Sequence, residues 1–401
     1  RHDLGDRRQY AFATDDYGAT WRSIAANLPA DAPVRVIRQD PREPNVLYAG
    51  TENALYVSLD RGARWERLRA GLPVVPVYDV RVQPAANDLL VATHGRGFFV
   101  LDDLSPLQQL AAARSAGVKL FPVRDATLWA AWPAIETGDA NALPANQFAS
   151  PNSPSGAVLS FYQKTKAAQR PWIEIVDASG KVVRTLRGRI PFDPADPPKE
   201  ERGRYFVTND AGLNRVAWDG NEDGPTRWLG TSFQNAGPAT GPEALPGKYT
   251  ARLHVGAATY EQSFTLADDP FSPWTPEQRA ARHAYLTTVF RWIDGIDRAL
   301  NEIDARLKKK PSPSDRAALL AVRDALSAND LHDEDSVAKP DRIRERVFAL
   351  TGPLGGNVQP PFEQHLAALD ALRPDVAAAY ARIGKILGPA FAPAPSPSPS
   401  P

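Results

Sequence analysis

The chain of 401 residues contains no cysteine and no methionine. Without cysteine it cannot form a disulfide, a thiolate metal site or a cysteine nucleophile. The same absence leaves the redox compartment open, because oxidising and reducing surroundings act alike on a chain without thiols. Any chemistry must therefore be carried by other side chains.

A surplus of one charge is also missing. The 47 Lys and Arg residues are balanced by 47 Asp and Glu residues, so the formal net charge at pH 7 is zero. Binding to a polyanion by bulk attraction depends on basic residues that release counterions. The balance therefore argues against a nucleic-acid partner.

Long apolar runs are absent as well. Charged residues or prolines interrupt the apolar stretches, which stay far below the roughly 20 apolar residues that a membrane-spanning helix requires. We therefore expect no membrane span. The chain begins at Arg1 without an apolar leader, so we expect any targeting signal to lie upstream.

A short motif is present twice near the start of the chain. Residues 14–21 and 58–65 share the form [ST]-x-D-x-G-x-x-W at a separation of 44 residues, which is close to the length of one four-stranded propeller blade. Residues 87–93 align with residues 45–51 as a third copy without the tryptophan motif. The repeated positions are Thr14, Asp16, Gly18 and Trp21 in the first copy and Ser58, Asp60, Gly62 and Trp65 in the second.

The composition of the motif is that of a hairpin turn that stabilises a fold. Glycine takes a positive φ without steric cost, and the aspartate can accept backbone N–H bonds across the turn. The tryptophan can bury a large apolar face between neighbouring sheets while its indole N–H finds a partner. We therefore expect both motifs to be structural.

These motifs resemble the Asp-box, or BNR, repeats of β-propellers, a family that includes sialidases, sortilin-type receptors and xyloglucan hydrolases. The resemblance implies a partial propeller of two to three blades over residues 1–104, with the motifs away from any active site. A closed propeller needs at least about four blades. We therefore expect the chain to be the C-terminal portion of a longer protein, with the missing N-terminal blades as its first partner.

Residues 92–104 resemble the end of the final blade in large bacterial BNR-repeat proteins, which are often described as glycosyl hydrolases or sortilin-like. Two interpretations of His94 and Arg96 follow. They contact an acidic ligand at the mouth of a blade, or Gly95 and Gly97 allow a tight bend and the two side chains are bonded locally.

A β-sandwich is expected over residues 157–268, after a connector at 105–156 that lacks periodicity and is rich in turn residues from 136 onward. Alternating apolar residues predict strands at 158–162, 172–176, 182–186, 213–218, 247–255 and 260–266. Residues 213–220 and 245–250 resemble the immunoglobulin-like domain of the flagellar hook cap protein and of many secreted modular proteins.

An insertion at residues 223–243 interrupts that resemblance. Its Trp228 and Phe233 could bind a ligand, but we expect them to pack back on the sandwich. Asp219, Asn221 and Asp223 match the first half of a calcium loop, yet Gly230 stands where the complete loop has a bidentate glutamate. A tight turn between strands explains the same residues.

Helices are expected over residues 274–388. Thr275, Pro276 and Gln278 form a capping box, and an apolar stripe runs from Tyr285 to Leu307. Further helices are predicted at about 315–326 and at 362–387, where Pro374 should break or kink the helix. We expect a helical hairpin or small bundle in which the first and third helices are antiparallel.

Two polar segments complete the chain. The acidic run 330–335 contains His332 and is expected to be a solvated loop, because it has no His pair at i, i+4 to support a metal site. The tail at 389–401 alternates Pro with Ala or Ser in most of its length and should be extended and disordered.

No catalytic motif occurs with its required context: there is no G-x-S-x-G, H-E-x-x-H, P-loop or dinucleotide fingerprint. We predict no catalytic residue and no cofactor. The favoured function is a non-catalytic part of an extracytoplasmic, sortilin-like propeller protein that presents a protein- or glycan-binding surface; the location rests on the resemblance. The alternatives are an accessory region of a glycoside hydrolase with its active site upstream, and a calcium-dependent adhesion module.

Overall fold

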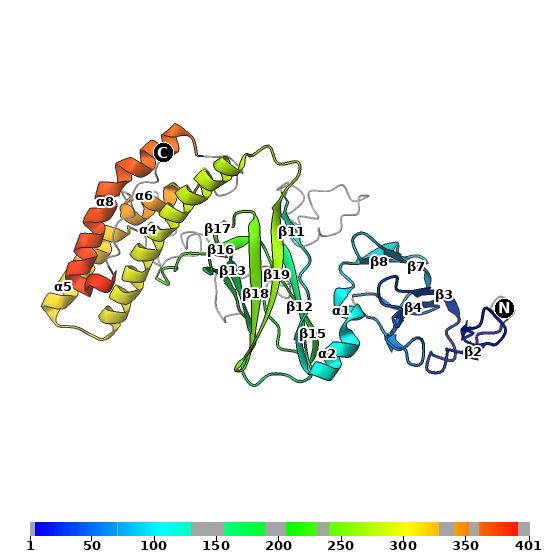
Figure 1. The fold of residues 1–401 in the computed structure, drawn as a ribbon. Coiled ribbons are helices and arrows are strands. Elements are labelled where there is room, and N and C mark those ends of the chain that lie inside the picture. The colour runs from blue at the N-terminus through cyan, green and yellow to red at the C-terminus, as the bar shows by residue number, and fades with distance from the viewer. Residues whose placement is uncertain are drawn as a thin grey trace. The chain divides into compact units, whose positions relative to one another are not determined.

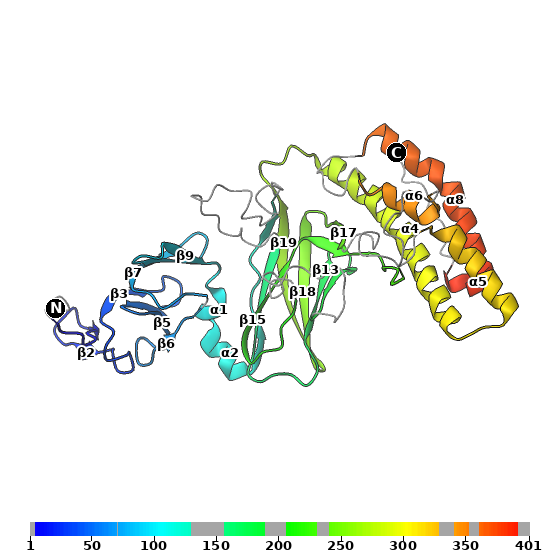
Figure 2. The same cartoon turned by 180° about the vertical axis from the view of Figure 1, so that it is seen from behind.

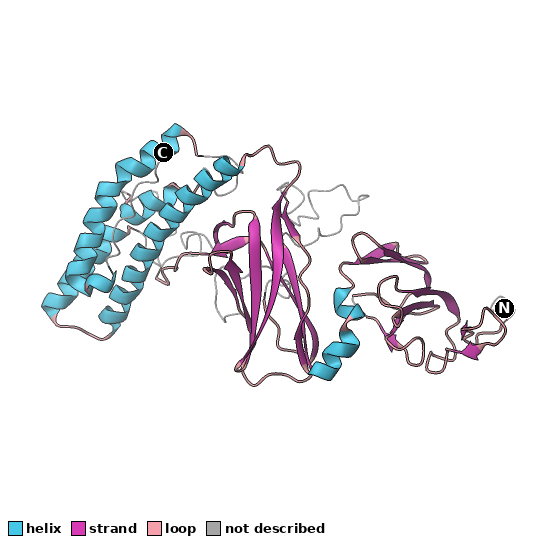
Figure 3. Cartoon of the chain, in the orientation of Figure 1, coloured by secondary structure: helices cyan, strands magenta, loops and turns pink. Residues whose placement is uncertain are grey.

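The computed structural model describes residues 5–69, 71–129, 156–188, 206–230, 240–328, 341–352 and 361–391. It is mainly β, with several separate sheets and a helical region that follows them in sequence (Figures 1 and 3). This confirms the expected mainly-β character of the chain. No helix within the described ranges is long and apolar enough to cross a membrane.

The chain divides into two compact units. The first contains Arg1–Arg124, Leu159–Arg170 and Asn209–Arg215, and the second contains Asp125–Val158, Pro171–Thr208 and Val216–Pro401. This division differs from the predicted domain ranges, because the strands at residues 157–163 and 212–218 each contribute residues to both units.

Three antiparallel sheets form the start of the first unit, and in each the strands are paired in sequence order. Core residues such as Val80, Leu89 and Val91 alternate with more exposed neighbours and are buried against one another. The strands are β1 (Phe12–Ala13) and β2 (Arg22–Ser23); β3 (Val34–Gln39), β4 (Leu47–Thr51), β5 (Leu55–Ser58) and β6 (Glu66–Arg67); and β7 (Val77–Gln83), β8 (Asp88–Thr93) and β9 (Phe98–Leu101).

The described part of the expected connector contains regular structure. It comprises α1 (Ser105–Gln108), α2 (Leu110–Ala116), β10 (Val118–Leu120) and β11 (Ala126–Leu128). β10 pairs with β12, and β11 pairs in parallel with β19. Strands of three residues are too short to show alternation, so the sequence did not reveal them. Residues 130–155 lie outside the described residues.

The strands expected over residues 157–268 are confirmed. They form sheets of order β10-β12-β15 and β11-β19-β18-β13-β14, and a small β16-β17 pair; β13, β18 and β19 run side by side (Figure 2). Trp218 packs against Tyr249 and Phe264, with ring centroids 5.2 and 6.0 Å away. The strands are β12 (Ala157–Gln163), β13 (Trp172–Asp177), β14 (Val182–Leu186), β15 (Gly212–Trp218), β16 (Asn221–Asp223), β17 (Thr240–Glu243), β18 (Gly247–Val255) and β19 (Ala258–Asp268).

The helical region begins with the predicted capping box. The side chain of Thr275 accepts from the backbone N–H of Gln278, and the Gln278 side chain accepts from the backbone N–H of Thr275. The expected apolar stripe, from Tyr285 to Ile303, is buried against the other helices. The elements are α4 (Pro276–Lys308), α5 (Pro313–Leu326), α6 (Ile343–Ala349), α8 (Glu363–Leu387) and the short η6 (Pro389–Phe391).

The predicted antiparallel arrangement of the first and third helices is wrong. The residue numbers of the contacting pairs increase together along the two helices. Tyr285 packs on His365, the Tyr380 hydroxyl donates to the Trp292 carbonyl, and Arg306 donates to the carbonyl of Leu387. α4 and α8 are therefore parallel (Figure 1). The reason is that α5 and the unpredicted α6 both run back along α4, so the chain returns to the beginning of α4 before α8 starts.

Pro374 does not break α8, which is one helix from Glu363 to Leu387. Leu372 and Val376 on either side of the proline are buried in the helical core, so packing offsets the lost backbone hydrogen bond. The acidic run at 330–335 and the tail from 392 onward lie outside the described residues.

Candidate functional site

The two [ST]-x-D-x-G-x-x-W motifs lie in equivalent hairpins. In the first, Phe12 pairs with Ser23; in the second, Tyr56 pairs with Arg67. Every paired position of the second hairpin lies 44 residues after its counterpart in the first. The sequence repeat is therefore also a structural repeat at the level of the hairpin.

Two side-chain hydrogen bonds recur in the two turns. The hydroxyl of Thr14 donates to Asp16 at 2.8 Å, and that of Ser58 donates to Asp60 at 2.8 Å. Each hydroxyl accepts from the backbone N–H of the motif glycine, also at 2.8 Å. Both glycines have a positive φ, 95° and 85°, which is the conformation that the motif requires of them.

Asp16 shows why the motif needs a carboxylate. The hydroxyl and backbone N–H of Thr20 and the hydroxyl of Thr14 donate to it and lower the pKa of its carboxyl to about 2. The charged acceptor holds the turn closed. The hydroxyl and carboxylate side chains of both motifs are thus engaged in hydrogen bonds of their own turns.

The hydroxyl at the first motif position should carry part of the stability. Ser58→Ala removes the acceptor of the buried Gly62 N–H and the donor to Asp60, so we expect the free energy of unfolding to fall by about 1 to 2 kcal/mol. Ser58→Thr keeps the hydroxyl that the first motif uses and should stay near the wild type. Urea denaturation of the three proteins checks this, and an unchanged Ser58→Ala midpoint would contradict it.

Trp65, the tryptophan of the second motif, is covered by residues that follow the first motif. The Trp65 indole N–H donates to the Ile24 carbonyl at 2.6 Å, and the Asn27 amide pairs with both the backbone N–H and the carbonyl of Trp65 at 2.8 Å. Trp65 is 3% exposed, whereas Trp21 is 62% exposed and its indole donates to Gly18 in its own turn. The motif tryptophan is thus buried in the second repeat and exposed in the first.

His94 and Arg96 lie in the bend between β8 and β9. Gly95 and Gly97 both have positive φ, and both side chains of interest are exposed. The His94 ring lies 5.1 Å from the Tyr78 ring, and the Arg35 guanidinium lies 4.8 Å above the same ring. The glycines therefore allow the bend, and His94 and Tyr78 pack beside it, with Arg35 held over the Tyr78 ring by its pair with Glu52.

The three calcium candidates have separate structural roles. Asp219 accepts from the backbone N–H of Asn221, whose carbonyl accepts from the Trp218 indole. Asp223 accepts from the backbone N–H of Thr185 at 3.1 Å. Among the residues that the structure describes, no group of three or more His, Asp or Glu side chains is placed to hold a metal ion.

Trp228 corrects the expectation that the insertion packs on the sandwich. Its side chain is 2% exposed and belongs to the core of the helical region. The reason is that α4 offers polar partners to the backbone of residues 226–229, which carries the indole between the helices. Phe233 lies outside the described residues.

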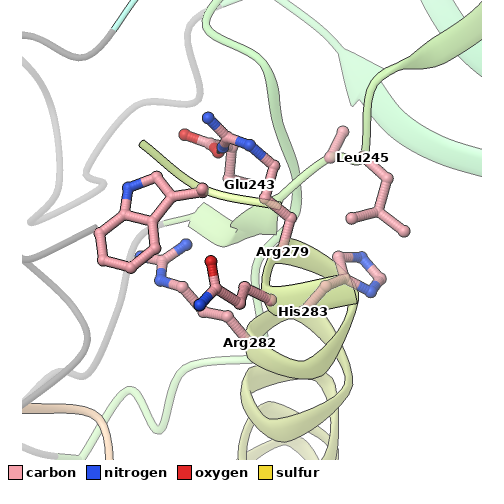
Figure 4. Close-up of a pocket in the computed structure, with 8 residues that line it drawn as sticks. Glu243, Leu245, Arg279, Arg282 and His283 are labelled. Carbon is pink, nitrogen blue, oxygen red and sulfur yellow. The ribbon is translucent and has the colours of Figure 1, made fainter. Parts of the chain in front are cut away.

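A recess lies at the start of α4 (Figure 4). Arg279 is held there by Asp268 and by Glu243, the latter at 2.9 Å. Burial lowers the pKa of the Arg282 guanidinium. The recess is lined by Glu243, Ala244, Leu245, Trp274, Gln278, Arg279, Arg282 and His283.

The Glu222 carboxylate beside the recess should make the stability of the fold depend on pH in the acid range. Burial raises the pKa of Glu222, but its contacts with His283 at 2.7 Å and Lys181 at 3.1 Å outweigh burial and leave the pKa below its ordinary value of 4.5. A lowered pKa stabilises the fold above that value, and the stabilisation is lost as the pH falls through and below it. We expect Glu222→Gln to flatten this acid limb in thermal melts, while Glu261→Gln, at an exposed site, keeps the wild-type profile. Equal profiles for wild type and Glu222→Gln would contradict it.

In comparisons with known proteins, no protein-family model and no curated protein sequence matches the chain.

Proposed function

We propose that the chain is a non-catalytic part of an extracytoplasmic, sortilin-like repeat propeller, and that it presents a surface for a protein or glycan ligand. The sandwich and the helical region support the propeller in this proposal. The extracytoplasmic location and the family rest on the resemblance of the motifs.

The observation that carries the proposal is the contact between consecutive repeats. Ile24 and Asn27 of the first repeat bind Trp65 of the second, so one repeat buries the tryptophan of the next. Trp21 has the same place in an equivalent hairpin but is exposed. A further repeat of the same kind would cover it, which is what a propeller with more blades supplies.

The side chains at the β8–β9 bend support a binding role. His94 and Arg96 are exposed there, the His94 ring packs on Tyr78, and Arg35 lies over the Tyr78 ring while it pairs with Glu52. Guanidinium groups pair with carboxylates, and aromatic rings provide area for contact. An acidic glycan or an acidic peptide segment fits this chemistry.

An array of carboxylated, sulfated and neutral glycans, together with acidic peptides, tests the proposal. We expect the chain to bind acidic probes, and we expect Arg96→Glu to weaken this binding without changing the melting temperature. Arg42→Glu, at an exposed site away from the bend, serves as the control. Turnover of aryl glycosides by the longer protein, with no acidic probe bound, would favour the hydrolase instead.

A further inference from the structure

Residues 225–230, here called the arm, leave the sandwich between β16 and β17 and lie along α4. Backbone groups of the arm are bound by side chains of that helix. The hydrogen bonds are Thr226 N–H to Asp294 at 2.9 Å, Trp228 N–H to Asp297 at 3.0 Å, Leu229 N–H to Asn301 at 2.8 Å and Asn301 Nδ2 to the Arg227 carbonyl at 2.7 Å. The arm, whose residues 229 and 230 form a turn, is thus held on a helix surface through its backbone.

The four α4 side chains form a regular ladder. Asp294, Asp297, Asn301 and Asp304 follow one another at intervals of 3, 4 and 3 residues, which places them on one face of a helix. Because these groups bind mainly backbone atoms, the ladder accepts a peptide segment largely without regard to side chains. Selectivity must come from elsewhere.

A socket for an indole supplies the selectivity. Two guanidinium groups lie over the Trp228 ring, that of Arg323 at 5.1 Å from its centroid and that of Arg344 at 5.6 Å. Its Nε1–H donates to Asp304 at 2.7 Å. An indole offers its aromatic ring to the cations and an N–H donor to the carboxylate, a combination that phenylalanine lacks.

A second position of the arm is restricted by space. A Cβ added at Gly230 would lie 2.6 Å from Asp304 Oδ2 and 2.6 Å from the indole nitrogen. By contrast, Leu229 between them is 76% exposed and is free to vary. The site therefore selects Trp-x-Gly.

We propose that this face of α4, closed by α5 and α6, is a peptide-binding site for a segment with the pattern Trp-x-Gly, and that the arm of the same chain occupies it. The tether gives the arm a high effective concentration, so a free peptide competes poorly with it. The site becomes available to a peptide when the arm is withdrawn. This inference does not depend on the propeller.

The test uses the full 401-residue chain with Trp228→Ala. A fluorescein-labelled peptide with the sequence of residues 224–230 is titrated with this variant, and fluorescence anisotropy is recorded. We expect saturable binding to the variant and binding at least about tenfold weaker to the wild type, whose own arm fills the site. A peptide with alanine at the tryptophan position should not bind.

Three further variants make the result specific. Trp129→Ala removes an indole that is 54% exposed and leaves the arm intact, so it should behave as the wild type. Asn301→Ala, added to Trp228→Ala, removes two backbone contacts and should weaken peptide binding about tenfold. Gly230→Val displaces the arm by a different route and should also expose the site.

The proposal fails if the peptide binds neither Trp228→Ala nor Gly230→Val. If the helical circular dichroism of those variants is intact, the socket does not recognise a free segment. If that signal is lost and the peptide does not restore it, the helical core needs the arm in order to fold and offers no site to a free peptide. Restoration of the signal by the peptide would support the proposal as directly as anisotropy.

Discussion

Replacing Arg344 with alanine lowers the free energy of unfolding of the helical region by about 3 to 5 kcal/mol. Arg344 and Asp297 are 2% and 0% exposed at their side chains and make two hydrogen bonds, at 2.6 and 3.0 Å. Without the guanidinium, the Asp297 carboxylate is buried beside the backbone N–H of Trp228 as its remaining donor. An uncompensated buried charge is the origin of the large effect.

Arg346 provides a matched control on the same helix. It pairs with Asp375 at 2.8 Å, but the two side chains are 47% and 51% exposed, so Arg346→Ala should cost about 0 to 1 kcal/mol. Urea denaturation followed by circular dichroism at a helical wavelength measures both variants. Equal losses for Arg344→Ala and Arg346→Ala would contradict the account of the buried pair.

Replacing Trp65 with alanine should destabilise the first sheets by about 3 to 5 kcal/mol, which is the usual cost of removing a buried large aromatic side chain. The same change at Trp21 should alter stability by about 0.5 kcal/mol or less, because its side chain is mostly exposed. The two substitutions remove the same residue from the same motif. Their difference therefore isolates the contact with the preceding repeat.

Hydrogen exchange at the backbone amides of residues 34–67 measures this effect locally. Faster exchange in Trp65→Ala and unchanged exchange in Trp21→Ala is the expected result. Comparable effects of the two changes would show that Trp65 is not stabilised by Ile24 and Asn27 in the way that the hydrogen bonds indicate.

The local parts of the fold were predictable because their causes lie within a few residues. The Thr275–Gln278 capping box fixed the start of α4, and the apolar stripe gave its buried face. Alternation along β18, with Tyr249, Ala251 and Leu253 buried, gave the strand and its inner face. The Asp-box turns followed from glycine and aspartate at fixed spacing.

The missed features depend on residues far apart in the sequence. The direction of α8 is set by α6, a helix of seven residues that is too short to show a stripe. Trp228 contacts residues about 70 positions later. One signal was present: Asp297 interrupts the apolar stripe between Ile296 and Leu300, and a charge there requires a buried partner.

His94 illustrates the same limit at the candidate ligand surface. The sequence placed it beside two glycines, and the positive φ of both explains the bend. Its contact with Tyr78 and the position of Arg35 above that ring come from pairing of β7 with β8 and from packing of β3 near β7. Such neighbours are decided by tertiary structure.

The most direct measurement of the central claim is the solvent protection of the two motif tryptophans. Hydroxyl-radical footprinting with mass spectrometry reports oxidation at Trp21 and Trp65 in the 401-residue chain and in the longer protein that carries the proposed further repeats. We predict that Trp21 is oxidised readily and Trp65 slowly in the former, and that both are protected in the latter. Trp21 remaining as reactive in the longer protein would contradict the claim that each repeat covers the tryptophan of the next.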